Sequence, residues 1–221
     1  MKNKQSGIGL FEKLPPEERD RIRDACLDEF ARVGFEQAST NRMVDNAGIP
    51  KGTLFFYFGS KRDLFLYLVD DCVQRYIQFL DKETGQLPSD LFERLLYIGR
   101  IKIKFSLAEP RIYQMFFQAF MHSPPELMEP LVERTRQYAT ASSQLMQSNI
   151  DQSDFRKDVS SQEIMALVSY LQDGILRKYL PYIKQHSPEE VLAMMDQITQ
   201  EFEQNIRLIK YGVYRIPQPD Q

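Results

Sequence analysis

The sequence is poor in the residues that build catalytic and metal sites. Its 221 residues include two histidines, two cysteines and no tryptophan. His122 and His186 lie in unrelated contexts, and the two cysteines have neither the spacing of a metal knuckle nor the number of a disulfide framework. We therefore expect no metal site, no cofactor and no histidine-based catalysis.

The two cysteines, Cys26 and Cys72, each lie within a helical pattern of apolar residues. The simpler interpretation is that both are reduced residues of the core. The alternative is a redox-sensing thiol, which requires an accessible sulfur with a lowered pKa.

Long hydrophobic runs are also missing. No stretch of about eighteen apolar residues is present to span a bilayer. The start of the chain, MKNKQSGIGLFEKLPPEE, has too short an apolar segment for a signal peptide. A composition of 43% hydrophobic and 27% charged residues is typical of soluble globular proteins. We therefore expect a cytoplasmic protein.

The chain carries little net charge, −3 in total, and the charge is unevenly distributed. Residues 1–62 have 11 lysines and arginines against 9 acidic residues, whereas residues 63–221 have 17 against 22. The first part is the better candidate for contact with an anion. This mild asymmetry does not by itself identify nucleic-acid binding.

Apolar periodicity predicts helices near the start of the chain. Apolar residues from Ile22 to Val33 recur at steps of three and four, which predicts a helix over 16–33 that ends at Gly34.

Two short helices are expected to follow. Ser39 or Thr40 offers a hydroxyl cap to the first of them, and Gly48 ends it. Leu54 and Phe58 form the inner face of the second. Two short helices joined by a tight glycine-containing turn and braced by a longer helix match the helix-turn-helix pattern.

Helical patterns continue to the end of the chain. Ser60 caps a long helix, and the last two helices are expected over 161–184 and 188–212. The sequence therefore predicts an all-α protein of about nine helices.

The residues from Gly34 to Phe65, GFEQASTNRMVDNAGIPKGTLFFYFGSKRDLF, carry an ordered set of motifs. These are a Gly-aromatic pair, an Ala-Gly-aliphatic turn, a Lys-Gly-Thr-Leu helix start, a Tyr-Phe pair and a Ser-Lys-x-x-Leu helix start. Together they resemble the DNA-binding signature of the TetR family of bacterial transcriptional regulators. The resemblance covers roughly residues 17–68.

The resemblance implies a non-enzymatic homodimer that places the third helix of each subunit in the major groove of double-stranded DNA. Residues 1–60 would form the helix-turn-helix DNA-binding domain, and residues 61–221 an effector-binding and dimerisation domain. The leading hypothesis is a repressor of a palindromic operator that a small, hydrophobic effector releases. The alternative is a helical protein-interaction module that has lost DNA binding, which Pro50, Phe55 and the acidic net charge would favour.

Backbone N–H groups and hydroxyls at helix starts suit phosphate oxygens, and an α-helix fits the major groove. On the resemblance and this chemistry, the expected DNA-binding residues are Thr40, Lys51, Gly52, Thr53, Phe55, Phe56, Tyr57 and Lys61. Three of these residues have a simpler role as well: Thr40 caps a helix, Thr53 fills a first turn, and Lys61 is a solvated charge. Asn41 and Arg42 rank below them.

Two positions depart from the family pattern. Pro50 replaces a frequent serine, and Phe55 replaces a frequent tyrosine, so each removes a hydroxyl that reaches phosphate. Since Leu54 and Phe58 fill the inner face, at least one of Phe55 and Phe56 should be exposed without DNA. Either these rings contact a thymine methyl or a sugar edge, or Phe55 packs into the core.

Aromatic residues and methionines are concentrated in the middle of the chain. This composition suits a pocket for a hydrophobic effector, although such residues also build ordinary cores. Arg100 and Lys104 lie one helical turn apart and either receive an acidic head group or are solvated. The candidate ligand-binding residues are Arg100, Lys104, Phe105, Tyr113, Phe117, Met121 and Tyr170.

The last two helices have apolar residues on more than one side. A four-helix contact between two copies would bury this surface, and ordinary intrachain packing is the alternative. The candidate dimerisation residues are Ile164, Leu167, Val168, Leu171, Ile175, Val191, Met194, Ile198 and Phe202.

Overall fold

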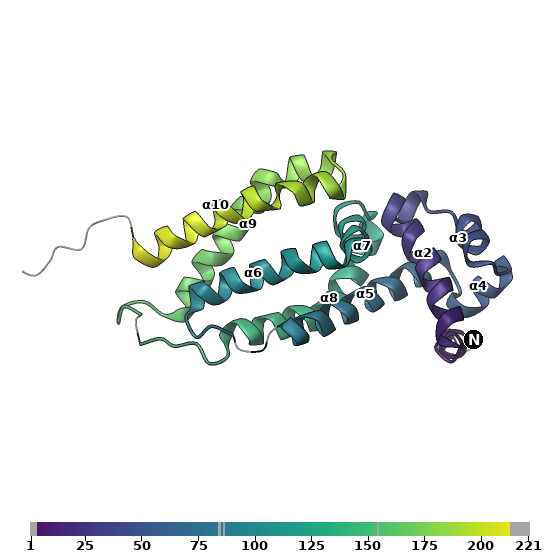
Figure 1. The fold of residues 1–221 in the computed structure, drawn as a ribbon, viewed down its shortest axis with the longest axis horizontal. Helices are drawn as coiled ribbons and strands as arrows, with labels where there is room; N and C mark the ends of the chain where they lie inside the picture. Colours follow the sequence, from purple (N-terminus) through teal and green to yellow (C-terminus); the bar gives the residue numbers. More distant parts are fainter. Residues whose placement is uncertain (1–3, 84, 86, 154, 213–221) are drawn as a thin grey trace, which may run out of the picture. The chain divides into compact units, whose positions relative to one another are not determined.

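The computed structural model describes residues 4–83, 85, 87–153 and 155–212, with side chains placed except at 4–6, 137–145, 147 and 161. These described residues form ten α-helices and no strand (Figure 1), which confirms the all-α class. The helices are α1 (Lys4–Phe11), α2 (Pro16–Gln37), α3 (Thr40–Ala47), α4 (Lys51–Phe58), α5 (Lys61–Glu83), α6 (Leu91–Ala108), α7 (Pro110–Met121), α8 (Pro125–Gln147), α9 (Ser161–Gln185) and α10 (Pro188–Tyr211).

The chain divides into two compact units. The first comprises residues 1–83 and 105–142, and the second comprises residues 84–104 and 143–221. The expected functional boundary at residue 60 lies inside the first unit, and it stays a prediction about function.

α2 begins as the sequence predicts and breaks where glycine allows it. Pro16 is its first residue, and two glutamates lie in its first turn, where a helix N-terminus favours negative charge. Gly34 has φ +73° and ψ −179°, outside the helical region, so the long helix breaks after Val33. One further helical turn continues to Gln37, four residues past the predicted end.

Gly34 also permits a close approach within the first unit. A Cβ atom built on Gly34 would lie 2.8 Å from Oε1 of Gln118 in α7. Any larger residue at this position would have to move α7 or its glutamine side chain.

α3 and α4 have the boundaries that their capping residues predict. Ser39 caps α3 by accepting a hydrogen bond from the Arg42 N–H, and Gly48 ends the helix in the left-handed region with φ +62°. Pro50 precedes α4 and supplies no side-chain cap, and Gly59 ends it with φ +78°. The helix-turn-helix pair therefore forms largely from local sequence signals.

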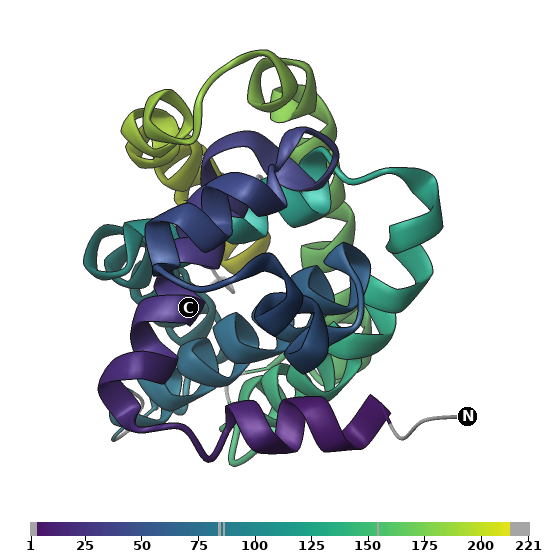
Figure 2. The ribbon, with the colours of Figure 1, turned by 90° about the vertical axis from the view of Figure 1, so that its right-hand side faces the viewer.

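α1 is the helix that the sequence did not predict. Its sequence, KQSGIGLF, contains two glycines and too few apolar residues for a periodic pattern. Phe11 at its end is fully buried, and α1 packs against α4. The helix is seen beside the N label in Figure 2, leading through a short turn into α2. Tertiary packing therefore accounts for α1, since short isolated helices are marginal in water.

The second unit has its own core. Leu91, Phe92 and Leu95 of α6 pack with Ile164 and Val168 of α9 and with Ile206 of α10. Capping boxes start both late helices, Ser160 with Glu163 for α9 and Ser187 with Glu190 for α10.

A buried arginine holds two loops of this unit together. The Arg94 guanidinium donates to the Pro88 carbonyl at 2.7 Å and to the carbonyl of Ser148 just after α8. The Asp151 N–H donates to the Ser89 carbonyl at 2.9 Å, which joins the same two loops a second time.

Within the described ranges, none of the helices combines the length and the apolar character needed to cross a membrane.

Candidate nucleic-acid interface

The predicted polar contacts lie at the starts of α3 and α4. Thr40 is the first residue of α3 and is half-buried. Lys51 and Gly52 open α4 and are exposed, and Thr53 beside them is half-buried. A Cβ built on Gly52 would meet no atom within 4 Å, so the space in front of this glycine is open.

The first three of the four consecutive aromatic residues of α4, Phe55, Phe56 and Tyr57, differ in exposure. Phe56 is 62% exposed, which confirms that at least one of the first two rings faces solvent. Phe55 is half-buried, with the Lys51 Nζ 6.0 Å from its ring centroid. Tyr57 is half-buried, and its ring lies 5.5 Å from that of Phe11. The outer face of α4 therefore presents a cation, an open backbone position and one exposed aromatic ring, that of Phe56, which also contacts the Tyr57 ring.

Lys61 is held by α2. Its Nζ donates to the Glu36 carbonyl at 3.1 Å and lies 5.0 Å from the Phe35 ring centroid. Partial burial lowers the pKa of this ammonium group. Lys61 is therefore an anchored cation at the start of α5, rather than the freely solvated one of the simpler interpretation.

Glu29 is an organising residue that sequence reasoning missed. Its carboxylate is 3% exposed and accepts hydrogen bonds from the Ser39 N–H at 2.8 Å, from Arg42 at 2.6 Å and from Arg32 at 2.6 Å. Burial by itself raises the pKa of Glu29, but these hydrogen bonds lower it to about 2. Glu29 therefore ties α2 to the capped start of α3.

The contact with Glu29 gives Arg42 a structural role. The sequence ranked this arginine below the other DNA candidates, and the structure commits its guanidinium to Glu29. No sequence signal singled out Glu29, because one acid in a helix rich in charged residues is indistinguishable from a solvated one.

The candidate effector residues divide between the two units. Phe105, Tyr113, Phe117 and Met121 belong to the first unit. Phe105 is buried, with its ring 4.7 Å from that of Tyr76.

The other three candidates, Arg100, Lys104 and Tyr170, belong to the second unit. Arg100 is exposed and lies 3.6 Å from the Glu203 carboxylate. Lys104 is exposed, and Tyr170 is 70% exposed.

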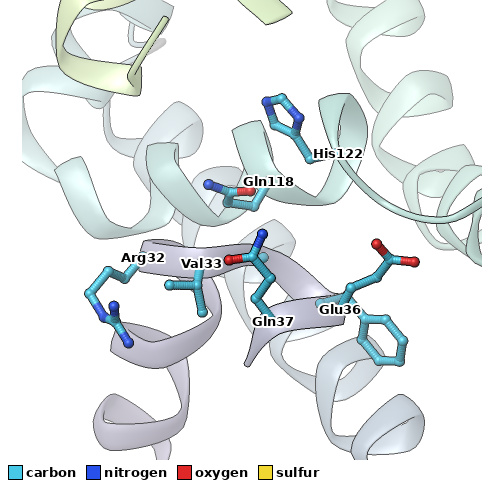
Figure 3. A pocket seen from close by; sticks show the side chains of 8 residues that line it. Arg32, Val33, Glu36, Gln37, Gln118 and His122 are labelled. Atoms are coloured by element: carbon cyan, nitrogen blue, oxygen red, sulfur yellow. The ribbon is translucent and has the colours of Figure 1, made fainter. Parts of the chain in front are cut away.

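A pocket of about 370 Å³ lies in the first unit, at the break in α2. In Figure 3, Gln118 and His122 lie on one side of the pocket, at the end of α7, and Arg32, Glu36 and Gln37 lie on the other side, on the last turns of α2. Its lining is mostly polar. None of the predicted effector residues lines it.

The candidate dimerisation residues are mostly covered within their own unit. Ile164, Val168 and Val191 are buried, and Leu167 is 51% exposed. The other candidates are partly buried; they are Leu171, Ile175, Met194, Ile198 and Phe202. Besides Leu167, four apolar side chains of α9 and α10 are exposed, namely Tyr170, Leu176, Leu208 and Tyr211.

Both cysteines are buried, and burial raises the pKa of the Cys26 and Cys72 thiols to about 12. They therefore fit the core interpretation, since a sensing thiol needs the opposite shift. In the part of the chain that the structure describes, no three His, Cys, Asp or Glu residues are grouped to hold a metal ion.

Comparisons with known proteins match both parts of the chain. The family model described as bacterial regulatory proteins, tetR family, matches residues 22–68. The model described as tetracyclin repressor-like, C-terminal domain, matches residues 89–214.

Individual relatives are similar over nearly the whole chain. The uncharacterized HTH-type transcriptional regulator YfiR of Bacillus subtilis is 24% identical over 191 residues, which cover 82% of this chain and 91% of the relative. The crystal structure of a TetR family transcriptional regulator from Chloroflexus aurantiacus superposes with a TM-score of 0.60 at 25% identity, covering 94% of this chain and 98% of that one.

A third similarity is at the level of fold alone. The transcriptional regulator FadR from Bacillus subtilis, in complex with stearoyl-CoA, superposes with a TM-score of 0.59 at 14% identity, covering 88% of this chain and 98% of that one.

Proposed function

The chain belongs to the TetR family of bacterial regulatory proteins, a DNA-binding and non-enzymatic family. From this premise we propose that it is a cytoplasmic repressor that binds an inverted-repeat operator as a homodimer and leaves it when a small hydrophobic effector binds. The repressor role is supported by the match to the tetracyclin repressor-like C-terminal domain.

The observation that carries the proposal is the open outer face of α4. Lys51 and Gly52 are exposed at its start and Phe56 is exposed one turn later. A helix with its inner face buried and this outer face open has the shape that enters the major groove. Its proposed contacts are the residues expected from the sequence: Thr40, Lys51, Gly52, Thr53, Phe55, Phe56, Tyr57 and Lys61.

The homodimer is supported by the exposed apolar side chains of α9 and α10. Leu167 and Tyr170 are three residues apart on α9, so they lie on one face of that helix. Exposed apolar patches of this kind mark protein contacts, and a two-fold contact covers such a patch with its own copy.

A hydrophobic effector is supported by the rings and thioethers of the first unit, and by the acyl-CoA in the complex of the FadR fold relative. We propose that Phe105, Tyr113, Phe117 and Met121 line the effector site. The polar pocket at the break in α2 does not have the lining that such an effector requires.

The test is a selection of random duplex DNA on the purified protein at low and high salt, with sequencing of the retained DNA. We expect an inverted repeat whose half-sites are about one DNA turn, roughly 34–36 Å, apart. We also expect it to be lost at high salt, because phosphate contacts release counterions. No enrichment at either salt would contradict the proposal and favour a protein-interaction module.

A further inference from the structure

The first turn of α1 lies against the last turn of α4. The last four carbonyl groups of a helix have no partner within it. In α4, the Phe55 carbonyl accepts from the Gly59 N–H at 2.8 Å, and the Phe58 carbonyl accepts from the Ser60 N–H at 2.9 Å. The two carbonyl groups between them, those of Phe56 and Tyr57, face Gly7 of α1.

No side chain fits at this contact. A Cβ atom built on Gly7 would lie 2.5 Å from the Tyr57 carbonyl oxygen and closer still to that of Phe56. Both obstacles are backbone atoms, so they cannot rotate away as a side chain does. Glycine at position 7 therefore allows α1 to rest directly on the backbone of α4.

The contact is favourable electrostatically as well. Gly7 is in the first turn of α1, where the helix dipole is positive, and residues 56 and 57 are in the last turn of α4, where it is negative. Both helices have only eight residues, so each depends on packing of this kind.

The other end of α1 is anchored behind α4. The Phe11 ring is fully buried, with its centroid 4.8 Å from that of Phe58 and 5.7 Å from that of Tyr67. The next residue, Glu12, accepts a hydrogen bond from the Tyr67 hydroxyl of α5. α1 is thus fixed at both ends against the helix that is proposed to read DNA.

We propose that α1 is a positioning element for DNA recognition, with Gly7 and Phe11 as its positioning residues. Resting on the carbonyl groups of residues 56 and 57, α1 fixes the C-terminal half of α4 and thereby the direction in which Phe56 and Tyr57 point. Binding sites need their contacting groups held within about 0.5 Å. This inference rests on the proposed DNA-binding role of the α4 face.

The test compares Gly7→Ala with Gly9→Ala. Both variants replace a glycine of α1 by the best helix former, but a Cβ at Gly9 meets no atom within 4 Å. A difference in operator affinity between the two variants therefore reports the contact with α4 and not helix propensity. Each protein is titrated with the selected operator and with an unrelated duplex of equal length, over a series of salt concentrations, and its thermal unfolding is recorded.

We expect Gly7→Ala to lower operator affinity about tenfold, the loss of roughly one good base contact. Its affinity for the unrelated duplex and its slope of log affinity against log salt should match those of the wild type, because no lysine or arginine that neutralises phosphate is displaced. Gly9→Ala should behave as the wild type in all measurements.

Three results would overturn the inference. The first is wild-type operator affinity in Gly7→Ala. The second is an equal loss of affinity for both duplexes that parallels a loss of thermal stability. The third is a smaller slope of log affinity against log salt, which would mean that α1 itself binds phosphate. Failure of the proposed function is a different result: the wild-type protein would then select no DNA sequence. That result would overturn this inference too.

Discussion

Glu29 shows how one buried side chain organises the start of α3. Its carboxylate joins the N–H of the α3 cap, Ser39, to the guanidinium groups of Arg32 and Arg42. Thr40, a proposed phosphate contact, follows directly after the cap. The position of that proposed contact therefore depends on a buried charge.

The depressed pKa of Glu29 makes folding depend on pH. In the folded state this pKa is about 2, whereas a glutamate in an unfolded chain has a pKa of about 4.3. The unfolded state therefore binds more protons, and the stabilisation is present above about pH 4 and is lost as the pH falls towards 2.

We predict that Glu29→Gln lowers the free energy of unfolding by about 2–3 kcal/mol at pH 7, because charged hydrogen bonds are lost at a buried site. The difference in the free energy of unfolding between Glu29→Gln and the wild type should shrink as the pH falls from about 5 to 2. Urea unfolding at several pH values measures both effects. Glu129→Gln, at an exposed position of α8, is the control. A difference that stays constant over this range would contradict the assignment.

The two phenylalanines of α4 make a second prediction at this scale. Phe56 is exposed and Phe55 is half-buried beside Lys51, so their replacement should have different consequences. Phe56→Ala should lower DNA affinity with a change in melting temperature of no more than a degree or two, because surface substitutions rarely alter stability. Phe55→Ala should lower the melting temperature as well. Equal losses of affinity and stability in Phe56→Ala would identify it as a core residue.

At the scale of elements, α2 combines a predictable start with a break at a position that requires glycine for two reasons. Gly34 adopts a φ of +73° with an extended ψ, a conformation that other residues avoid, and an added Cβ would lie 2.8 Å from the Gln118 side chain of α7. The sequence indicated the glycine as a helix end. The sequence could not indicate the α7 contact, because Gln118 is distant along the chain.

We predict that Gly34→Ala destabilises the protein by about 2–3 kcal/mol, since the backbone strain alone costs about 1–3 kcal/mol. Adding Gln118→Ala removes the side-chain contact but leaves the strain, so the double variant should recover only part of the loss. Thermal or urea unfolding of the three proteins measures this.

The control for this prediction is Gly99→Ala in α6, where an added Cβ meets no atom within 4 Å. It should leave stability unchanged or raise it slightly, because alanine favours a helix. Full recovery in the double variant would show that crowding, and not the φ angle of Gly34, sets the cost.

At the scale of the whole molecule, the proposed dimer depends on which apolar residues of the last two helices stay uncovered. The sequence indicated a stripe that included Ile164, Leu167 and Val168. The structure buries the first and the last of these in the core of the second unit, and it leaves Leu167 exposed. Part of the stripe is therefore intrachain core, as the alternative interpretation held.

We predict that Leu167→Glu converts the protein from dimer to monomer and lowers operator affinity at least tenfold, because a charge placed in an apolar contact is left unpaired. Thermal stability of the monomer should be nearly unchanged, since the side chain is exposed within its own unit. Sedimentation analysis and DNA titration measure these effects. Gln172→Glu, at another exposed position of α9, is the control. A variant that stays dimeric would place the contact elsewhere.

The sequence by itself determined the features that depend on neighbouring residues. Helix caps such as Ser39, breaks such as Gly34 and Gly48, and the inner face of α4 all follow from chemistry within one or two turns. The ordered motif from Gly34 to Phe65 also predicted the family. These features are local, so they can be predicted without knowledge of the tertiary structure.

The tertiary structure decided the features that join distant residues. It gave α1 a partner in α4, assigned Glu29 to the start of α3, and left Phe56 rather than Phe55 the more exposed ring. Each depends on a contact between segments far apart in sequence. Burial at such a contact makes a single acidic residue or glycine necessary for the packing of the two segments. Such a residue has no local pattern of its own, so only the folded chain reveals its role.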